Sequence, residues 1–125
     1  QLLKLVKKFD DSHSVIFIPD VFIPKLTLAE CISLPIAINN NCHNPSIDDV
    51  IINRQKTIEA MKNIEVQFEN VYIFDLQDTF CDEKCDYFYQ ENYAFSNDRY
   101  HITVEASSFL SKAFNDFLSF NNISP

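Results

Sequence analysis

Glycine is absent from all 125 residues of the chain, although average usage would give roughly nine. The phosphate-binding loops of nucleotide enzymes need glycine where the backbone approaches the phosphates closely. The P-loop and the dinucleotide-binding fingerprint are therefore excluded. Asparagine also tolerates a positive φ angle, so we expect it to occupy the turn positions that need one.

Positive charge and long apolar runs are also scarce. Lys and Arg number 10 against 18 Asp and Glu, which gives a net charge of −8. A surface of this sign repels phosphate backbones, so no nucleic-acid partner is expected. No apolar run approaches the length of a membrane span, and no signal peptide is visible. The chain starts with Gln1 inside a helix-like pattern, and we expect it to be a piece of a longer protein.

Hydrophobic residues make up 46% of the chain, which suits one domain with one core. Apolar residues recur at helical spacing in three segments, which predicts helices over 1–9, over 46–70 and from Thr103 onward. Ser46 is expected to cap the second helix, with Asp49 at the capping-box position. The apolar positions are Leu2, Leu5, Val6 and Phe9, then Ile51, Ile58, Met61 and Phe68, then Ala106, Phe109, Leu110, Ala113, Phe114, Phe117 and Leu118.

Two short runs, "SVIFIP" at 14–19 and "VYIFDL" at 71–76, are apolar on both faces and predict buried strands of a parallel sheet. Residues 86–96 alternate loosely and predict a hairpin that turns around Glu91-Asn92. Helices that alternate with strands indicate an α/β layer fold. Two buried strands are too few for a covered sheet, so we expect this chain to be the C-terminal part of a domain.

The four cysteines are Cys31, Cys42, Cys81 and Cys85. An even count favours disulfides in an oxidising compartment, and local pairing would join Cys31 to Cys42 and Cys81 to Cys85. Four reduced thiols remain an alternative. Zinc is a third, because the spacing of Cys81 and Cys85 is ligand-like and His43 follows Cys42.

Two stretches contain the residue types of a Ser-His-Asp triad: "DDSHS" at 10–14 and "SNDRYHITVEASSFL" at 96–110. In the second, Asp98 and His101 stand three apart in a turn that enters a helix. The carboxylate could accept a hydrogen bond from Nδ1–H of the imidazole and leave Nε2 as a general base. Taken alone, the pair is more typical of an Asp near a helix N-cap and a surface His than of a catalytic pair.

The segment 71–114, "VYIFDLQDTFCDEKCDYFYQENYAFSNDRYHITVEASSFLSKAF", resembles the C-terminal block of SGNH hydrolases. More narrowly, it is similar to the SGNH domain fused to family 3 membrane acyltransferases. That block has a strand ending in Asp, a Cys pair, a short hairpin, and Asp-x-x-His-Leu-Ser before the final helix. Asp75 ends the strand here, and residues 98–103 match the motif, with Ile102 and Thr103 for Leu and Ser. Ala106 and Ser107 replace the usual Gly-Ala.

The resemblance extends over residues 1–118, because "VIFIPDVFIPKLTLAEC" also fits the family's strand, Pro-containing loop and Cys. It implies a three-layer α/β/α fold with a parallel sheet, of which residues 1–125 form the C-terminal portion. Asp98 and His101 are then the acid and base of the triad. Ser12 follows a helix, opens a strand and lacks the Gly of the family's nucleophile turn. We therefore expect the nucleophile and the oxyanion donors upstream of Gln1.

The family also implies an O-acyltransferase or esterase acting on sugar hydroxyls. Its acceptor would be a polysaccharide or lipid-linked sugar such as an O-antigen, and the acyl donor a membrane domain of the same longer chain. The expected location is the periplasmic face of a bacterial inner membrane, with no cofactor or metal in this segment. The alternatives are a non-catalytic SGNH-like module that binds glycan or a partner, and a free-standing esterase fragment.

The remaining polar and aromatic residues are expected to be structural. His13 and His43 should lie in loops, and the aromatic residues from Tyr87 to Phe95 should belong to the core. The acidic residues Asp48, Asp49, Asp82 and Glu83 should be solvated.

Overall fold

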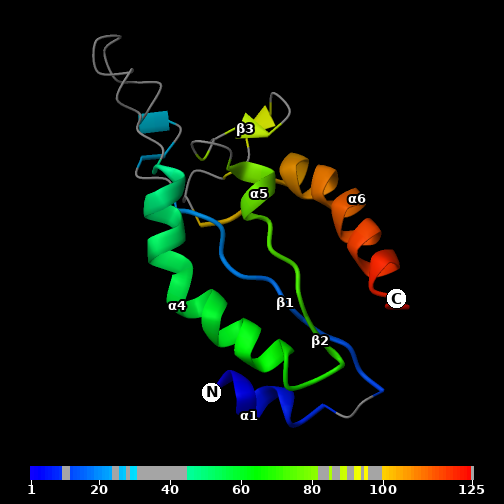
Figure 1. The fold of residues 1–125 in the computed structure, drawn as a ribbon. Helices are drawn as coiled ribbons and strands as arrows, with labels where there is room; N and C mark the ends of the chain where they lie inside the picture. Colours follow the sequence, from blue (N-terminus) through cyan, green and yellow to red (C-terminus); the bar gives the residue numbers. More distant parts are fainter. Residues whose placement is uncertain are drawn as a thin grey trace.

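The computed structural model describes residues 1–9, 12–23, 26–27, 29–30, 45–81, 85, 88–89, 92–93, 95 and 100–124. In this part of the chain, two strands lie between a long helix and the C-terminal helix (Figure 1). The elements are α1 Leu2–Val6, β1 Val15–Phe17, α4 Ile47–Glu65, β2 Val71–Ile73, α5 Gln77–Phe80, β3 Phe88–Tyr89, β4 Asn92–Tyr93 and α6 Val104–Phe120.

The two apolar runs pair with each other as parallel strands. β1 and β2 are in register from Val15 opposite Val71 to Phe17 opposite Ile73. Parallel neighbours need a crossover connection, and α4 provides it. The prediction of an α/β fold with a parallel sheet is confirmed.

Helices lie on both faces of this strand pair. On one face, Phe17 and Val71 pack in a cluster with Met61 and Ile64 of α4 and with Val6 of α1. On the other face, the Phe74 ring contacts two phenylalanines of α6. Its centroid lies 5.1 Å from that of Phe114 and 5.0 Å from that of Phe117. The described elements therefore form three layers, helix on strand on helix.

The N-terminus of α4 forms as predicted. The Ser46 hydroxyl accepts a hydrogen bond from the Asp49 N–H at 3.2 Å, and Asp48 and Asp49 are exposed in the first turn. The predicted end at residue 70 is wrong, because the helix stops at Glu65 and a turn follows. This turn lets the chain reverse and enter β2 at Val71.

The buried face of α4 differs from the predicted one. Its buried residues are Val50, Arg54, Met61 and Ile64, whereas Ile51 is 47% exposed. α4 crosses over a short strand pair, so only part of its apolar surface finds a partner. The same reason applies to α1, where Val6 is 1% exposed but Leu5 and Phe9 are 48% and 44% exposed. The predicted helix at 1–9 is shorter in the structure, because α1 ends at Val6.

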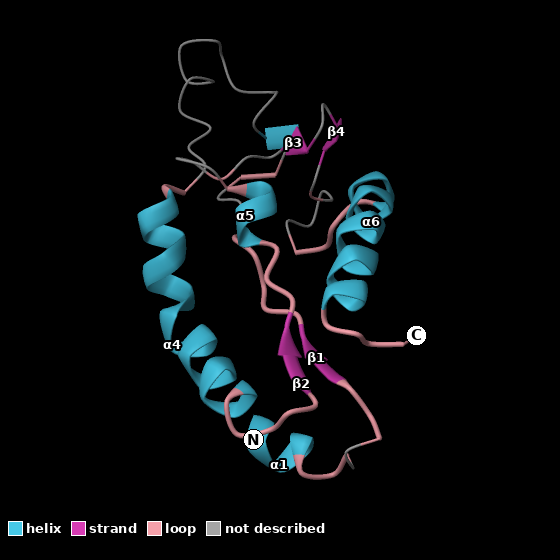
Figure 2. Cartoon of the chain, turned by 45° about the vertical axis from the view of Figure 1, so that its right-hand side comes forward, coloured by secondary structure: helices cyan, strands magenta, loops and turns pink. Residues whose placement is uncertain are grey.

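The predicted hairpin is present between β3 and β4, with Phe88 opposite Tyr93 and Tyr89 opposite Asn92. Asn92 therefore belongs to a strand and not to the turn. Figure 2 shows the hairpin beside the start of α6, and β4 contacts that helix. The short helix α5 was not predicted. Its four residues are too few for a periodic signal.

Asn122 has a φ angle of 55°, so an asparagine supplies the positive φ that closes α6. This agrees with the expectation that asparagine takes over from the missing glycine. Among the described helices, none is long and apolar enough to cross a membrane.

Candidate active site

Three segments meet beyond the carboxyl ends of β1 and β2. They are residues 18–23 after β1, the start of α5 after β2, and the turn at 100–103 before α6. Together they line a cavity of about 230 Å³. Its lining residues are Ile18, Pro19, Asp20, Val21, Phe22, Ile23, Leu76, Phe95, Tyr100 and Ile102. In open α/β sheets this edge is where ligands bind.

His101 lies in the turn that borders this cavity. Its neighbours Tyr100 and Ile102 line the cavity, and Ile102 forms an antiparallel bridge with Phe95. On the other side of Ile102, the Thr103 hydroxyl accepts the Ala106 N–H at 3.2 Å and caps α6. The turn is thus held on the C-terminal side of His101, and the His101 side chain is exposed to solvent.

Asp98, the predicted partner of His101, lies outside the described residues. Its hydrogen bond to Nδ1 of His101 stays a prediction. The structure places His101 between Tyr100 and Ile102, which both line the cavity, and before the N-terminus of α6. A general base must reach both the nucleophile and solvent-borne reactants, and an exposed position permits this.

Arg54 is buried beside this edge and was not predicted as a site residue. Its Nη2 donates to the Asp75 carboxylate at 2.7 Å, and its Nη1 donates to the amide oxygen of Gln77. The same Asp75 oxygen accepts the Gln77 N–H at 3.0 Å. The guanidinium therefore ties the crossover helix to the segment after β2. Two features of the sequence could have predicted this ion pair. Arg54 lies four residues after Val50 on the same face of the helix, and Asp75 follows the apolar run at 71–74.

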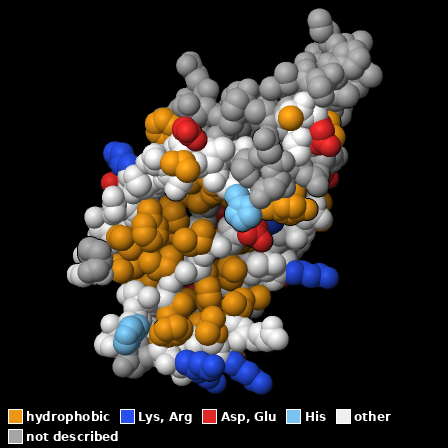
Figure 3. All heavy atoms as spheres, turned by 180° about the vertical axis from the view of Figure 1, so that it is seen from behind, with side chains coloured by type: hydrophobic (Ala, Val, Ile, Leu, Met, Phe, Trp, Pro, Cys, Tyr) orange, Lys and Arg blue, Asp and Glu red, His pale blue; other side chains and the backbone are white. Residues whose placement is uncertain are grey.

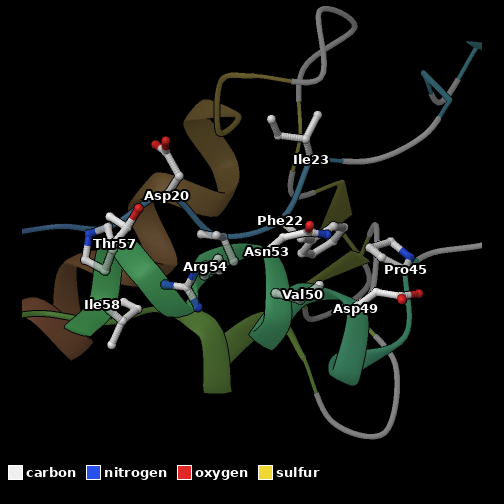
Figure 4. Close-up of a pocket in the computed structure, with 12 residues that line it drawn as sticks. Asp20, Phe22, Ile23, Pro45, Asp49, Val50, Asn53, Arg54, Thr57 and Ile58 are labelled. Carbon is white, nitrogen blue, oxygen red and sulfur yellow. The ribbon is translucent and has the colours of Figure 1, made fainter. Parts of the chain in front are cut away.

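A second and larger cavity, of about 580 Å³, opens between residues 19–23 and α4 (Figure 4). Its polar and charged lining residues are Asp20, Asp49, Asn53, Arg54 and Thr57. In Figure 4 the Asp20 carboxylate points away from Arg54, so the counter-charge of the guanidinium is Asp75. Residues 19–23 line both cavities.

Ser12 lies at the opposite edge of the strand pair. It precedes β1, and its hydroxyl contacts Nδ1 of His13 at 3.1 Å. The Asn70 side-chain amide donates to the His13 carbonyl at 2.8 Å and holds this turn against the entry to β2. Since the strands are parallel, Ser12 is at their amino ends and His101 is beyond their carboxyl ends. The structure therefore separates Ser12 from His101 by the length of the strands.

Cys81 and Cys85 are joined by a disulfide, which is the local pairing that the sequence predicts. Cys85 is 0% exposed and packs with Phe80 and Leu110 in the cluster under the cavity. Because their sulfurs are bonded to each other, these two residues are not the thiolate pair of the zinc alternative. Cys31, Cys42 and His43 lie outside the described residues.

Layers of helix around parallel strands, with a cavity at the strands' carboxyl ends, define the class of α/β layer domains that bind ligands at this edge. The model of one family, described as the SGNH domain fused to AT3 domains, matches residues 1–116. The chain belongs to this family, a hydrolase-like module found in an acyltransferase context. No curated protein and no solved structure is significantly similar to the chain.

Proposed function

We propose that the chain is part of an enzyme that transfers an acyl group to or from a sugar hydroxyl through a Ser-His-Asp triad. The observation that carries the proposal is the position of His101. It stands in the only described turn that joins the cavity at the carboxyl ends of the strands to the capped start of α6. Membership of the SGNH family supports a triad there.

In the proposed reaction, His101 acts as the general base. Nε2 would take the proton of a serine hydroxyl as its oxygen attacks the acyl carbonyl, and would return that proton to the leaving group. Asp98 would accept from Nδ1–H and stabilise the imidazolium that forms. A sugar hydroxyl or water would then attack the acyl-serine through the same base, which releases the product and restores the serine.

The serine and the oxyanion donors are proposed to lie upstream of Gln1. Ser12 does not fit, because it stands at the amino ends of the strands. A nucleophile must lie within hydrogen-bond reach of the base. The chain is thus proposed to be the C-terminal portion of one domain, with the acid and the base but not the nucleophile.

The proposed acceptor is a polysaccharide or lipid-linked sugar, and the proposed acyl donor is a membrane acyltransferase domain of the same longer chain. The family's description as a domain fused to AT3 domains supports this pairing. The Cys81–Cys85 disulfide supports an oxidising compartment, for which we propose the periplasmic face of a bacterial inner membrane.

The test compares two histidine substitutions in the complete protein that contains this chain. His101→Ala should lower the hydrolysis of 4-nitrophenyl acetate and the O-acylation of the glycan by roughly 10³-fold or more. His13→Ala is the matched control. His13 is also exposed but lies before β1, and this variant should keep the activity of the unchanged protein.

An activity of His101→Ala within tenfold of the unchanged protein contradicts the proposal. If neither protein hydrolyses the ester nor acylates glycan while both bind it, the module is non-catalytic. Circular dichroism of both variants separates a loss of chemistry from a loss of fold, since an exposed side chain contributes little to stability.

A further inference from the structure

We propose that the larger cavity, between residues 19–23 and α4, binds one uncharged sugar unit of the acceptor glycan. Two observations carry this inference: the division of the cavity into a polar and an apolar wall, and a buried guanidinium that keeps an unpaired donor. The assignment to the acceptor rests on the proposed function. Sugar binding itself is measured without catalysis and does not depend on the triad.

One wall of the cavity is a polar stripe on α4. Asp49, Asn53 and Thr57 line the cavity and recur at every fourth residue, which places them on one face of the helix (Figure 4). All three are exposed, and no hydrogen bond joins their side chains to another described residue. They offer a carboxylate, an amide and a hydroxyl, and each of these groups can bond to a hydroxyl of a ligand.

The wall formed by residues 19–23 is mainly apolar. Pro19, Val21 and Phe22 line the cavity there. The Phe22 ring is fixed by an edge-on contact with Phe95, with 4.9 Å between the ring centroids. A pyranose ring has hydroxyl groups around its edge and C–H groups on its faces. It therefore matches a site with a polar wall on one side and an apolar wall on the other.

Arg54 provides the buried donor. It lines the same cavity, and its Nε is buried without a hydrogen-bond partner. Asp75 and Gln77 accept from its other two nitrogens. A buried donor without an acceptor costs free energy. A ligand oxygen that enters from the cavity would offset this cost, so we expect the ligand to present an acceptor to Arg54.

The charges around the cavity favour an uncharged ligand. Asp20 and Asp49 both line it, whereas the charge of Arg54 is balanced by Asp75. Because two carboxylates remain and the whole chain has a net charge of −8, an acidic sugar or a phosphate would be repelled. A cation would leave the Arg54 donor unpaired. A sugar hydroxyl can donate to a carboxylate and accept from a guanidinium, so a neutral sugar satisfies both groups.

The shape and place of the cavity also suit a sugar unit. Figure 3 shows a contrasting surface, where apolar side chains gather over the middle of the face seen from behind. The larger cavity is instead hollow, and its volume of about 580 Å³ is typical of small-ligand sites. Residues 19–23 line it and also the cavity beside the turn of His101. A sugar unit bound here would place the next unit of the glycan toward His101.

The test is an NMR titration of the complete protein, followed through its backbone amide signals. The probes are the methyl glycosides of glucose, galactose and mannose, and the uronic acid counterpart of each. At least one neutral glycoside should shift the signals of Asn53 and Thr57 in a saturable way, and its uronic acid counterpart should bind at least about tenfold more weakly. No saturable shift with any neutral glycoside overturns the proposal, and so does equal binding of the charged counterpart.

Substitutions locate the bound sugar. Asn53→Ala should weaken the binding of the neutral glycoside about tenfold, because the amide is lost as donor and acceptor. Gln55→Ala is the matched control, since Gln55 is also an exposed amide on α4 but does not line the cavity. This variant should bind like the unchanged protein. Equal dissociation constants for the two variants would place the sugar elsewhere and overturn the proposal.

His101→Ala separates this inference from the proposed function. His101 is not a lining residue of the larger cavity, so the variant should bind the glycoside like the unchanged protein. A failure of the proposed function would appear in the activity of His101→Ala and not in this binding. Loss of binding in His101→Ala would assign the sugar to the smaller cavity and overturn the present proposal.

Discussion

Arg54 shows how one residue can connect the layers of this fold. Among the described residues, Arg54 is the charged residue that is buried, with 8% of its surface exposed. Its Nε has no hydrogen-bond partner. Burying a charge is costly unless it is paired. Here Asp75 provides the opposite charge and Gln77 a second acceptor. The pairing compensates for desolvation and fixes the segment after β2 against α4.

Removing the Arg54 guanidinium should therefore destabilise the protein. Arg54→Ala is expected to lower the free energy of unfolding by about 2–3 kcal/mol, because two hydrogen bonds are lost, one of them to a carboxylate. Asp75 can regain water, since its side chain is 35% exposed, so the loss stays below that of a fully buried pair. Urea denaturation measures it, with exposed Lys56→Ala as control. Equal midpoints for the two variants would show that the pair is not stabilising.

A substitution of Ser12 tests whether this serine is the nucleophile of the proposed triad. If the nucleophile lies upstream, Ser12→Ala should leave the activity of the complete protein within twofold of the unchanged protein. The reason is positional, since the turn that contains Ser12 is held against Asn70 at the amino ends of the strands. Mass spectrometry after incubation with an activated ester should find no acyl group on Ser12. An acyl adduct on Ser12 would make this chain supply its own nucleophile.

At the scale of elements, α6 covers the strands and follows directly on the turn at residues 100–103, which contains His101. Its apolar face packs Ala106 and Leu110 into the cluster below the cavity, and Phe114 and Phe117 against Phe74. On the exposed face, the hydrogen bond from Lys112 to Asp116 raises the pKa of Lys112. Such exposed pairs add little to stability. The stability of α6 thus comes from its apolar face and its cap.

Loss of the Thr103 cap should lower the stability of α6. Thr103→Ala removes the acceptor for the Ala106 N–H and is expected to lower the free energy of unfolding by about 1 kcal/mol. Thr103→Ser keeps the hydroxyl and should lose much less. Thermal denaturation followed by circular dichroism compares the two. Identical losses for the two variants would assign the effect to the methyl group of Thr103 and not to the cap.

At the scale of the whole molecule, the described residues form two apolar clusters. One lies between α1, α4 and the strands, and the other lies under the cavity between α5, α6 and the Cys81–Cys85 disulfide. Cys85 also donates its N–H to the Pro45 carbonyl at 3.4 Å, just before α4. The second cluster thus joins the start of α4 to the end that holds His101.

The disulfide should stabilise this end. Replacing Cys81 and Cys85 together by Ala is expected to lower the free energy of unfolding by about 2 kcal/mol in the chain-entropy model for so short a loop. Mass spectrometry of the unreduced protein should find the two residues in one linked peptide. The predicted Cys31–Cys42 bond would appear as a second linked pair. Four alkylatable thiols would remove the support for an oxidising compartment.

The amino-acid sequence by itself determined the local features. The two strands within 14–19 and 71–76, the Ser46 cap, the start of the last helix at Thr103, the hairpin and the paired Cys81 and Cys85 follow from side-chain periodicity and short spacing. Each depends on residues only a few positions apart, so neighbours in the sequence suffice to predict it. The motif around His101 also placed that residue before the last helix.

Only the tertiary structure decided which distant groups meet. Arg54 bonds residues 21 and 23 positions away, and Glu65 closes the edge of β2 at Ile73. Neither contact has a local signature, because each depends on the angle at which α4 crosses the strands and on the turn that ends it at residue 65. For the same reason, periodicity predicted Ile51 on the buried face of α4, whereas the crossing placed Arg54 there.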